Sequence, residues 1–383
     1  MKHDRTVGQR LSRREVLRLF AAASLLTTPA LLAAACSRAT SAAATSTVTV
    51  YCSLDRDIIE PVLKAAGTAL TLTIEAVYDT EATKTTGLAL RLRSEAARPR
   101  ADLWLSSEAI NTANLAAEGL LDPLPDQTTP LSTILSRWPK AHRTPTWVQL
   151  ALRARVIVHN PKALDRTNAR PPESLLDFAH PRFKGRAAIA DPRFGTTRGH
   201  LALLHQTLSA EGFRIYLQAL KANELQIVPG NAAVVRAVAR GEAHLGITDI
   251  DDLRAAERES WPVVESPATS TATNNPASTP ELPTLDPRDR AAIIAATRIN
   301  TPTTLAFVRS APNPAGAQRL AAWLLEKNLE TALAVPQWGA QPVDPLVEQP
   351  ARPSPAKPTP EPDWSTLKDH ITPALNLWQQ IMG

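Results

Sequence analysis

Short apolar strands alternate with helical segments along residues 47–308, and this alternation limits the possible folds more than any other feature. Runs rich in Val, Ile, Leu and Tyr predict strands at 47–51, 70–77, 101–105, 153–158, 186–190, 225–228, 244–247 and 303–308. Helical segments follow most of these runs. Two parallel strands need a crossover connection between them, which is usually an α-helix, so strands separated by helices are expected to run parallel. The sequence therefore predicts an α/β protein with mainly parallel sheets flanked by helices.

The first 36 residues have the pattern of an export signal. Arg13 and Arg14 precede an apolar run from Leu19 to Ala35, which ends at Cys36. A basic segment, an apolar segment and small residues before a cleavage point are typical of a signal peptide. The arginine pair resembles a twin-arginine signal, and Leu-Leu-Ala-Ala-Ala-Cys resembles a bacterial lipobox. We therefore expect lipidation at Cys36 and an extracytoplasmic, membrane-anchored lipoprotein, in the periplasm or on the outer face of the cytoplasmic membrane.

Two other interpretations of this segment stay open. The apolar run can be an uncleaved membrane anchor, although it is short against the roughly 20 apolar residues that a spanning helix needs. Export can also follow the general secretion route instead of the twin-arginine route.

Charge and cysteine content exclude two classes of protein. Removing residues 1–35 takes away six of the 42 Lys and Arg and two of the 37 Asp and Glu, which leaves 36 against 35. This balance offers no electrostatic footprint for nucleic acid. The only cysteines are Cys36 and Cys52, so a lipid on Cys36 leaves Cys52 without a disulfide partner. Stability must therefore come from burial of apolar residues.

The expected domain order follows from these patterns. A signal peptide (1–35) and a flexible lipid tether (36–46) precede a first lobe, which is formed by 47–141 plus 301–345. A second lobe covers 142–300 and contains a polar, Pro-rich insertion at 266–290. Residues 346–383 are expected to form a Pro-rich connector and a terminal helix that contains Pro373.

Polar residues stand where predicted strands end and helices begin, the place where open α/β sheets bind ligands. Asp55 and Glu108 take such positions in the first lobe, but acids there can equally be helix caps. In the second lobe, Gly195, Thr196 and Thr197 open one helix and Asn231 opens another. Free N–H groups at such helix starts favour an anion.

An acidic run follows the strand at 244–247. Thr248 is followed by Asp249, Asp251 and Asp252. Repulsion among these carboxylates would raise their pKa values unless a cation or an arginine lies nearby. Hard cations bind several oxygen ligands, so the run favours a cation site. Solvated surface acids are the alternative explanation.

Six segments, in this order and spacing, resemble the substrate-binding proteins of ABC importers, and most closely the ferric-ion-binding branch. They are Val50-Tyr-Cys-Ser-Leu-Asp55, Arg98-Pro-Arg-Ala-Asp-Leu-Trp104, Glu118-Gly-Leu-Leu121, Arg153-Ala-Arg-Val-Ile-Val-His-Asn160, Pro181-Arg-Phe-Lys-Gly-Arg186 and Gly241-Glu-Ala-His-Leu-Gly246. The resemblance covers residues 47–345. It implies a two-lobed, hinged fold of the periplasmic-binding-protein type II class, with the ligand cleft between the lobes.

The resemblance also implies site residues. In that branch a His, an acid and a Tyr pair bind iron; here Asp55 takes the His place, Glu108 lies at or beside the acid, and Ile250-Asp251 replaces the Tyr pair. A synergistic anion is held at a helix N-terminus with an Arg nearby, which the segment 195–197 and Arg153 match.

Two ligand classes stay open. The first is a metal ion such as Fe³⁺ on Asp55, Glu108, Asp249 and Asp251, with an anion on Arg153, Gly195, Thr196, Thr197, Asn231 and Thr248. The second is an anionic metabolite, phosphonate-like or carboxylate, held by the helix N-termini and Arg153. In both cases we expect a monomer that delivers its solute to an ABC permease with its ATPase. No catalytic residue and no cofactor are expected, since a bound metal would be the transported ligand.

Two further classes of protein are alternatives to a transport protein. A secreted hydrolase with Cys52 as nucleophile lacks a His at a recognisable motif spacing, and the chain contains neither Gly-x-Ser-x-Gly nor His-Glu-x-x-His. A sensor or structural lipoprotein would use the same cleft, so only neighbouring permease and ATPase genes would separate it from an importer subunit.

Overall fold

The computed structural model describes residues 47–79, 86–126, 129–267, 282, 284–335, 338–348 and 362–383. The predicted signal peptide, the tether with Cys36, most of the 266–290 insertion and most of the Pro-rich connector lie outside these residues. Among the described helices, none has the length and apolar composition that crossing a membrane requires.

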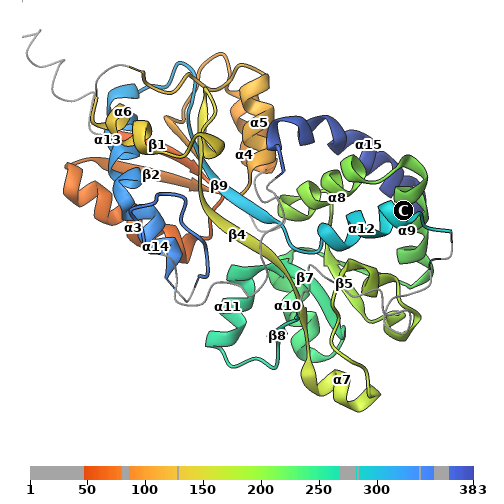
Figure 1. Ribbon diagram of the computed structural model, residues 1–383. Helices are drawn as coiled ribbons and strands as arrows, with labels where there is room; N and C mark the ends of the chain where they lie inside the picture. The colour runs from red at the N-terminus through yellow and green to blue at the C-terminus, as the bar shows by residue number, and fades with distance from the viewer. Residues whose placement is uncertain are drawn as a thin grey trace, which may run out of the picture. The chain divides into compact units, whose positions relative to one another are not determined.

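A mixed sheet forms the centre of the described chain (Figure 1), with strand order β2-β1-β3-β9-β4-β7-β5-β6 and β8 paired to β4. The strands are β1 (Thr47–Cys52), β2 (Thr73–Tyr78), β3 (Leu103–Ser106), β4 (Trp147–His159), β5 (Ala187–Ala190), β6 (Gln226–Val228), β7 (Leu245–Asp249), β8 (Val264–Glu265) and β9 (Asn300–Phe307). Within the trio β1, β2 and β3 and within the trio β5, β6 and β7, all pairs are parallel. The expected α/β arrangement is therefore present in both trios.

Two long strands connect the trios and run antiparallel to their neighbours. Residues 147–154 of β4 pair with β9, and residues 155–159 pair with β7. The strand predicted at 153–158 is thus only the second part of β4, and the antiparallel pairing was not predicted, because a run of apolar residues carries no sign of its partner's direction. β9 also pairs with β3, so both trios share the β4–β9 ladder.

A bulge in β4 lies just before the polar residues of this strand. The register with β9 shifts between Leu150 and Leu152, and Ala151 has a φ of 46°, in the left-handed region. The buried Glu330 carboxylate accepts the Ala151 N–H at 2.7 Å, which compensates this unusual conformation. Because side chains alternate along a strand, Arg153 and Arg155 then lie on the same face of β4.

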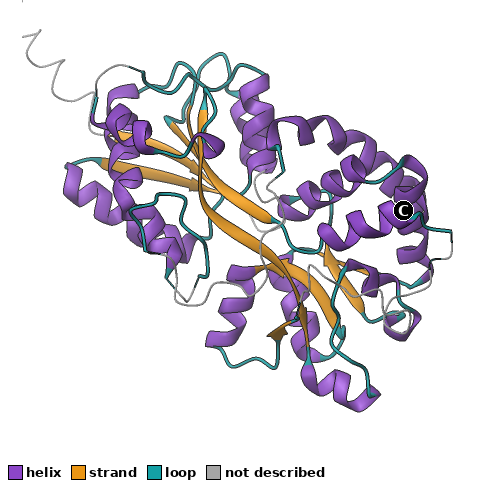
Figure 2. Cartoon of the chain, in the orientation of Figure 1, coloured by secondary structure: helices purple, strands orange, loops and turns teal. Residues whose placement is uncertain are grey.

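Helices cover both faces of the sheet (Figure 2). The described ones are α3 (Arg56–Leu70), α4 (Thr86–Ser94), α5 (Ala109–Ala117), α6 (Pro130–Arg137), α7 (Pro161–Thr167), α8 (Gly195–Thr207), α9 (Ala210–Ala222), α10 (Asn231–Arg240), α11 (Ile250–Arg258), α12 (Pro287–Ala295), α13 (Pro314–Trp323), α14 (Leu329–Ala334) and α15 (Trp364–Met382). A π-helical turn at Leu324–Asn328 joins α13 to α14. The terminal helix α15 has Pro373 inside it.

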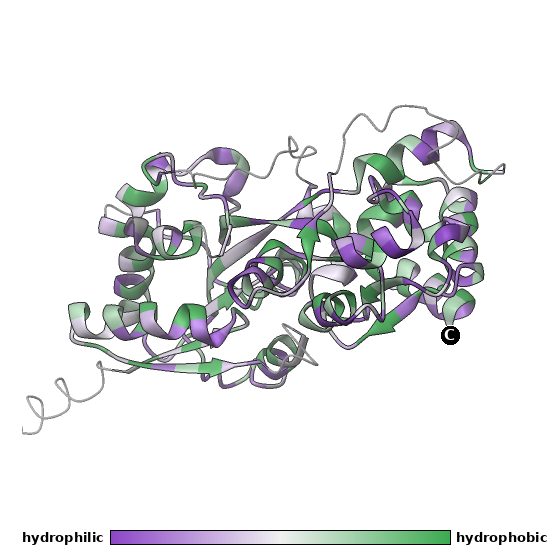
Figure 3. Ribbon diagram, turned by 90° about the horizontal axis from the view of Figure 1, so that it is seen from below, coloured by the Kyte–Doolittle hydropathy of each residue, from purple (hydrophilic) through white to green (hydrophobic). Residues whose placement is uncertain are grey.

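Apolar residues line the sides of the helices that face the sheet. Along α3 the buried residues are Ile58, Ile59, Val62, Leu63 and Ala66, which share one face at helical spacing. Figure 3 shows hydrophobic and hydrophilic residues alternating along the turns of the helices in the same way. Burial of these faces therefore holds the helices on the sheet, and it fixes the helix starts that surround β4.

Candidate functional site

Arg153 lies between two small cavities at the middle of β4. The helix-end cavity, of about 30 Å³, is lined by Ser107, Arg153, Asp191, Asp249, Asp252 and the starts of α8 and α10. The Asp55 cavity, of about 20 Å³, is lined by Ser107, Arg153, Asp55, Asp251, Thr303 and apolar residues. Each cavity has room for about one water-sized group. Arg153 and Ser107 belong to both linings and form the wall between them.

The starts of α8 and α10 present free backbone N–H groups to the helix-end cavity. Their N-cap residues, Phe194 and Gly230, make no side-chain capping bond in the described structure. Gly195 has a φ of 53°, a conformation that glycine adopts readily and that turns the chain into α8. Unsatisfied N–H groups and the helix dipole favour an oxyanion at such a position.

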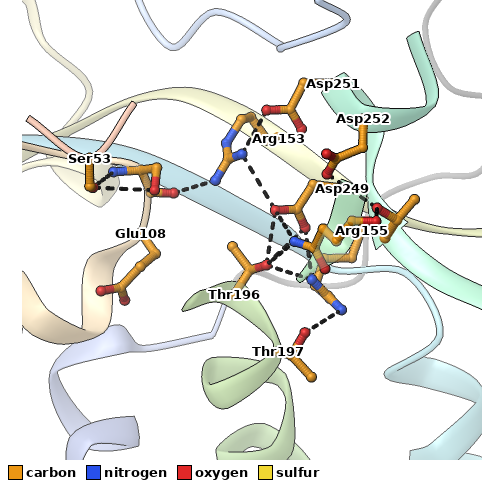
Figure 4. A network of polar contacts seen from close by, with 12 residues as sticks. Ser53, Glu108, Arg153, Arg155, Thr196, Thr197, Asp249, Asp251 and Asp252 are labelled. Carbon is orange, nitrogen blue, oxygen red and sulfur yellow. Dashed lines mark hydrogen bonds and ion pairs between the residues drawn. The ribbon is translucent and has the colours of Figure 1, made fainter. Parts of the chain in front are cut away.

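Arg155 is fully buried and organises the floor of this cavity (Figure 4). Its Nη1 donates to Asp249 Oδ1 at 2.8 Å and to Thr196 Oγ1 at 2.6 Å, and its Nη2 donates to Thr197 Oγ1 at 3.2 Å. Its Nε donates to His200 Nδ1 at 3.2 Å. These bonds fix both threonine side chains.

His200 accepts the hydrogen bond from Arg155 Nε as a neutral ring. Its Nε2 lies 2.8 Å from the carbonyl oxygen of Ala296, so the proton is on Nε2 and Nδ1 is the acceptor. Burial first, and the charge of Arg155 second, lower the pKa of His200 to about 3. The ring therefore carries no charge at neutral pH.

Arg153 joins opposite walls of the cavities (Figure 4). Its Nη1 lies 2.8 Å from Asp251 Oδ2 and 3.4 Å from Asp249 Oδ2, and its Nη2 donates to the carbonyl oxygen of Ser107. Burial acts to lower the pKa of Arg153, but Asp251 and Asp249 outweigh it and raise that pKa. A single guanidinium thus links Ser107, two residues before α5, to the start of α11.

The acidic run forms a compact cluster. Asp249, Asp251 and Asp252 each offer a carboxylate oxygen, and these oxygens all lie within 4.8 Å of one another. Asn231 Nδ2 donates to Asp249 Oδ2 at 3.0 Å, and Thr248 Oγ1 donates to Asp252 Oδ2 at 3.2 Å. The cluster has the oxygen density that a hard cation requires, and the two arginines provide counter-charge.

A family model described as bacterial extracellular solute-binding protein matches residues 56–334. The chain belongs to this family. The relationship confirms the resemblance found in the sequence, and it places the protein among extracellular solute-binding proteins rather than in a family of enzymes.

Individual relatives of this solute-binding protein are distant. The Fe(3+)-binding periplasmic protein of Serratia marcescens is 28% identical over 177 residues, which cover 43% of this chain and 50% of that protein. The chain thus matches about half the length of that relative. Iron-bound HitA from Pseudomonas aeruginosa superposes with a TM-score of 0.67 at 20% identity, over 88% of this chain and 99% of HitA.

A third comparison also shows the fold. AfuA from Actinobacillus pleuropneumoniae, described with exogenous fructose-6-phosphate bound, gives a TM-score of 0.68 at 16% identity, over 88% of this chain and 98% of AfuA. These superpositions confirm the predicted type II periplasmic-binding-protein fold.

Most of the predicted site residues of this solute-binding protein line one of the two cavities. Arg153, Gly195, Thr196, Thr197, Asn231 and Asp249 line the helix-end cavity, and Asp55, Asp251 and Arg153 line the other. Thr248 lines neither, and its hydroxyl contacts the Asn231 carbonyl oxygen at 3.3 Å and the Asp252 carboxylate. It supports the cavity wall rather than forming it.

Glu108 caps α5. Its carboxylate accepts the N–H groups of Ile110 at 2.5 Å and Asn111 at 3.1 Å, and it points away from Arg153 in Figure 4. Burial raises the pKa of Glu108, and the nearby Arg198 opposes that effect. Glu108 lines neither cavity, so a metal-binding role for it stays a prediction.

Several residues of the site were not predicted. Arg155 and His200 were missed, and Asp252 was noted only as part of the acidic run. Arg155 follows Arg153 by two positions in a strand, so the period of two was a usable signal. The three tyrosines, Tyr51, Tyr78 and Tyr216, are all described and line neither cavity.

Proposed function

We propose that this protein captures its solute outside the cytoplasmic membrane for an ABC importer, and that the solute is a hard metal cation such as Fe³⁺ held with an oxyanion. One observation carries the proposal. Three carboxylates with oxygens within 4.8 Å of one another adjoin a cavity into which two uncapped helices present their N–H groups. Such a pair of features suits a cation and an anion bound side by side.

The cation takes its ligands from the acidic cluster and from Asp55. Asp251 and Asp55 face one cavity, and Thr303, which is 1% exposed, has an Oγ1 without a hydrogen-bond partner there. An oxygen left in this state costs free energy unless a partner arrives. A cation replaces the Arg153 guanidinium as counter-charge for Asp251, because both cannot occupy the same side of the carboxylate.

The anion takes its hydrogen bonds from the start of α8. Thr196 donates its hydroxyl proton to Asp249 Oδ2 at 2.9 Å, so that proton is committed. Thr197 Oγ1 accepts from Arg155, which leaves the Thr197 hydroxyl proton free to be donated into the cavity. Together with the N–H groups of the helix start, this provides several donors for one oxyanion.

The relatives support iron as the metal, because the Serratia protein is named for Fe(3+) binding and the HitA structure is described as iron-bound. The absence of a tyrosine from both cavities means that the oxygen ligands here are carboxylates, which hard cations accept.

A second candidate is an oxyanion solute without metal. It is favoured by the pairing of Arg153 with Asp251 and of Arg155 with Asp249. Because these charges compensate one another, the partial positive charge of the helix starts is left without a counter-charge. The sugar phosphate described with AfuA is a solute of this class.

Transport further requires an anchor and partners. In this account the lipid on Cys36 holds the protein at the outer face of the membrane, and a monomer delivers the solute to a permease driven by a cytoplasmic ATPase. No catalytic step is proposed. Replacement of Cys36 with Ala should release the protein from membranes in soluble form, whereas retention after a carbonate wash would favour an uncleaved anchor.

Native mass spectrometry of the protein purified from its own host, with elemental analysis, tests the solute. The proposal expects iron or another hard metal together with a small oxyanion. A phosphorylated or carboxylated metabolite without metal would replace it with the second candidate. A neutral solute that carries no charged group would contradict both.

A further inference from the structure

The C-terminal helix α15 packs against helices from both strand trios. In Figure 1 it lies along α8 and next to α9, and its first turn reaches α5. α5 follows β3 of the first trio, and α8 follows β5 of the second trio. A single helix at the end of the chain therefore touches both parts of the molecule that border the cavities.

The first turn of α15 covers the point where α5 meets α8. A Cβ atom placed on Gly199 of α8 would lie 3.2 Å from Ile110 Cδ1 and 3.4 Å from Trp364 Cζ3. Trp364 is only 2% exposed. Gly199, Ile110 and Trp364 thus form a joint between three helices, and the absence of a side chain at Gly199 lets them approach.

This joint lies one turn from the cavity. Arg198, next to Gly199, donates from Nη2 to Asn111 Oδ1 of α5 at 2.7 Å. Ser107, just before α5, and Thr196 and Thr197, at the start of α8, line the helix-end cavity. Separation of α5 from α8 would therefore move opposite walls of the cavity apart and would expose the Trp364 ring.

The cavities are narrow beside the proposed solute. Volumes of about 30 and 20 Å³ leave room for single water-sized groups, whereas an oxyanion beside a metal ion is larger. We therefore expect loading to involve an opening of the kind that two-part binding proteins perform by hinge motion.

We propose that α15 is a clasp: Trp364 holds α5 against α8 and so sets how readily the cavity opens. The clasp concerns the same cavity as the proposed function, but its effect on the ligand-free protein does not depend on which solute binds. Weakening the clasp shifts the population toward the open form before any solute is present.

The same helix offers a matched control. Trp378, near the other end of α15, is 7% exposed and lines a mostly apolar cavity that contains no residue of α5. The cavity is lined by Leu201, Tyr216 and Leu217 and also by Arg155, Thr197 and His200. Loss of the Trp378 ring therefore removes a similar apolar contact without touching α5.

The test compares Trp364→Leu with Trp378→Leu in the full chain. Small-angle scattering of the ligand-free proteins should give a larger radius of gyration for Trp364→Leu than for Trp378→Leu, at similar losses of thermal stability. Dissociation of Fe³⁺ with phosphate should be roughly tenfold faster for Trp364→Leu and within about twofold of the native rate for Trp378→Leu. Gly199→Ala, which places a methyl group in the joint, should act in the direction of Trp364→Leu.

The clasp is contradicted if the two tryptophan variants change scattering equally or if neither changes it. Should Trp364→Leu fail to fold, the smaller Gly199→Ala substitution decides in the same two measurements. If Fe³⁺ with phosphate does not bind at all, the proposed solute is wrong, while the scattering comparison still decides the clasp.

Discussion

The Nη1 atom of Arg155 lies 2.8 Å from Oδ1 of Asp249, and both side chains are buried. A buried ion pair contributes little net stability, but loss of one partner leaves the other charge uncompensated. This pair also positions Thr196 and Thr197, so it prepares the cavity before a solute arrives.

Arg155→Met should therefore destabilise the protein strongly. The variant leaves the Asp249 carboxylate buried without its main counter-charge, and we expect a loss of about 3–5 kcal/mol in unfolding free energy. Urea denaturation measures this loss. The double variant Arg155→Met with Asp249→Asn should recover part of it, and a double variant as unstable as the sum of the single ones would show that the pair is not coupled.

Arg153→Gln separates the two candidate solutes by the sign of its effect. If a cation replaces the guanidinium beside Asp251, removal of the arginine strengthens binding of the metal without anion. The affinity rises about tenfold for each 1.4 kcal/mol that displacement of the guanidinium would otherwise cost. If the solute is an oxyanion alone, the same variant weakens its binding. Calorimetric titration with each solute class distinguishes the two results.

Thr197 and Thr196 form a matched pair for the anion. Thr197→Val removes the free hydroxyl proton and should weaken oxyanion binding roughly 10- to 100-fold, since a hydrogen bond to a charged group contributes about 1.5–3 kcal/mol. Unfolding free energy should fall less in this variant than in Thr196→Val, because Thr197 makes one 3.2 Å bond to Arg155. Thr196 bonds both Arg155 at 2.6 Å and Asp249 at 2.9 Å, so Thr196→Val should mainly lower stability. Equal effects on binding and stability in both variants would contradict the assignment of the two hydroxyl protons.

Stability should fall in acid because His200 is buried as a neutral ring. An unfolded histidine takes up a proton near pH 6.5, whereas His200 in the folded protein does so only near pH 3, so protons favour the unfolded chain between these values. Its contribution is constant above about pH 6.5 and is lost as pH falls toward 3, by on the order of 5 kcal/mol. Unfolding free energies measured by urea denaturation at several pH values between 7 and 4 should depend less on pH for His200→Gln than for the native protein. The same dependence on pH in both proteins would refute His200 as the cause.

The sequence was sufficient to predict local structure, but it was insufficient to predict which strands pair with one another and in which direction. The runs that became β1, β3 and β7 were recognised because their apolar pattern is local, and Gly195 and Asn231 were recognised because helix starts have a composition of their own. The antiparallel direction of β4 depends on β9, which lies more than a hundred residues away. No local pattern contains that information.

The same limit applies to the site. Arg155 pairs with Asp249 across 94 positions of sequence, and an arginine inside an apolar strand gives no indication of which acid it meets. Glu108 shows the opposite difficulty, since an acid before a helix has the same spacing whether it caps the helix or binds a metal. Only the direction of the side chain separates these roles.

In the proposed site, the acidic cluster and the helix starts hold a hard cation together with an oxyanion. Its most direct test is equilibrium uptake of Fe³⁺ from a weak chelate by metal-stripped protein, with and without phosphate, in the native chain and in Asp251→Ala. We expect stoichiometric uptake that depends on phosphate and is weakened roughly 100-fold or more in Asp251→Ala. Absence of uptake with phosphate present, or uptake that Asp251→Ala leaves unchanged, would contradict it.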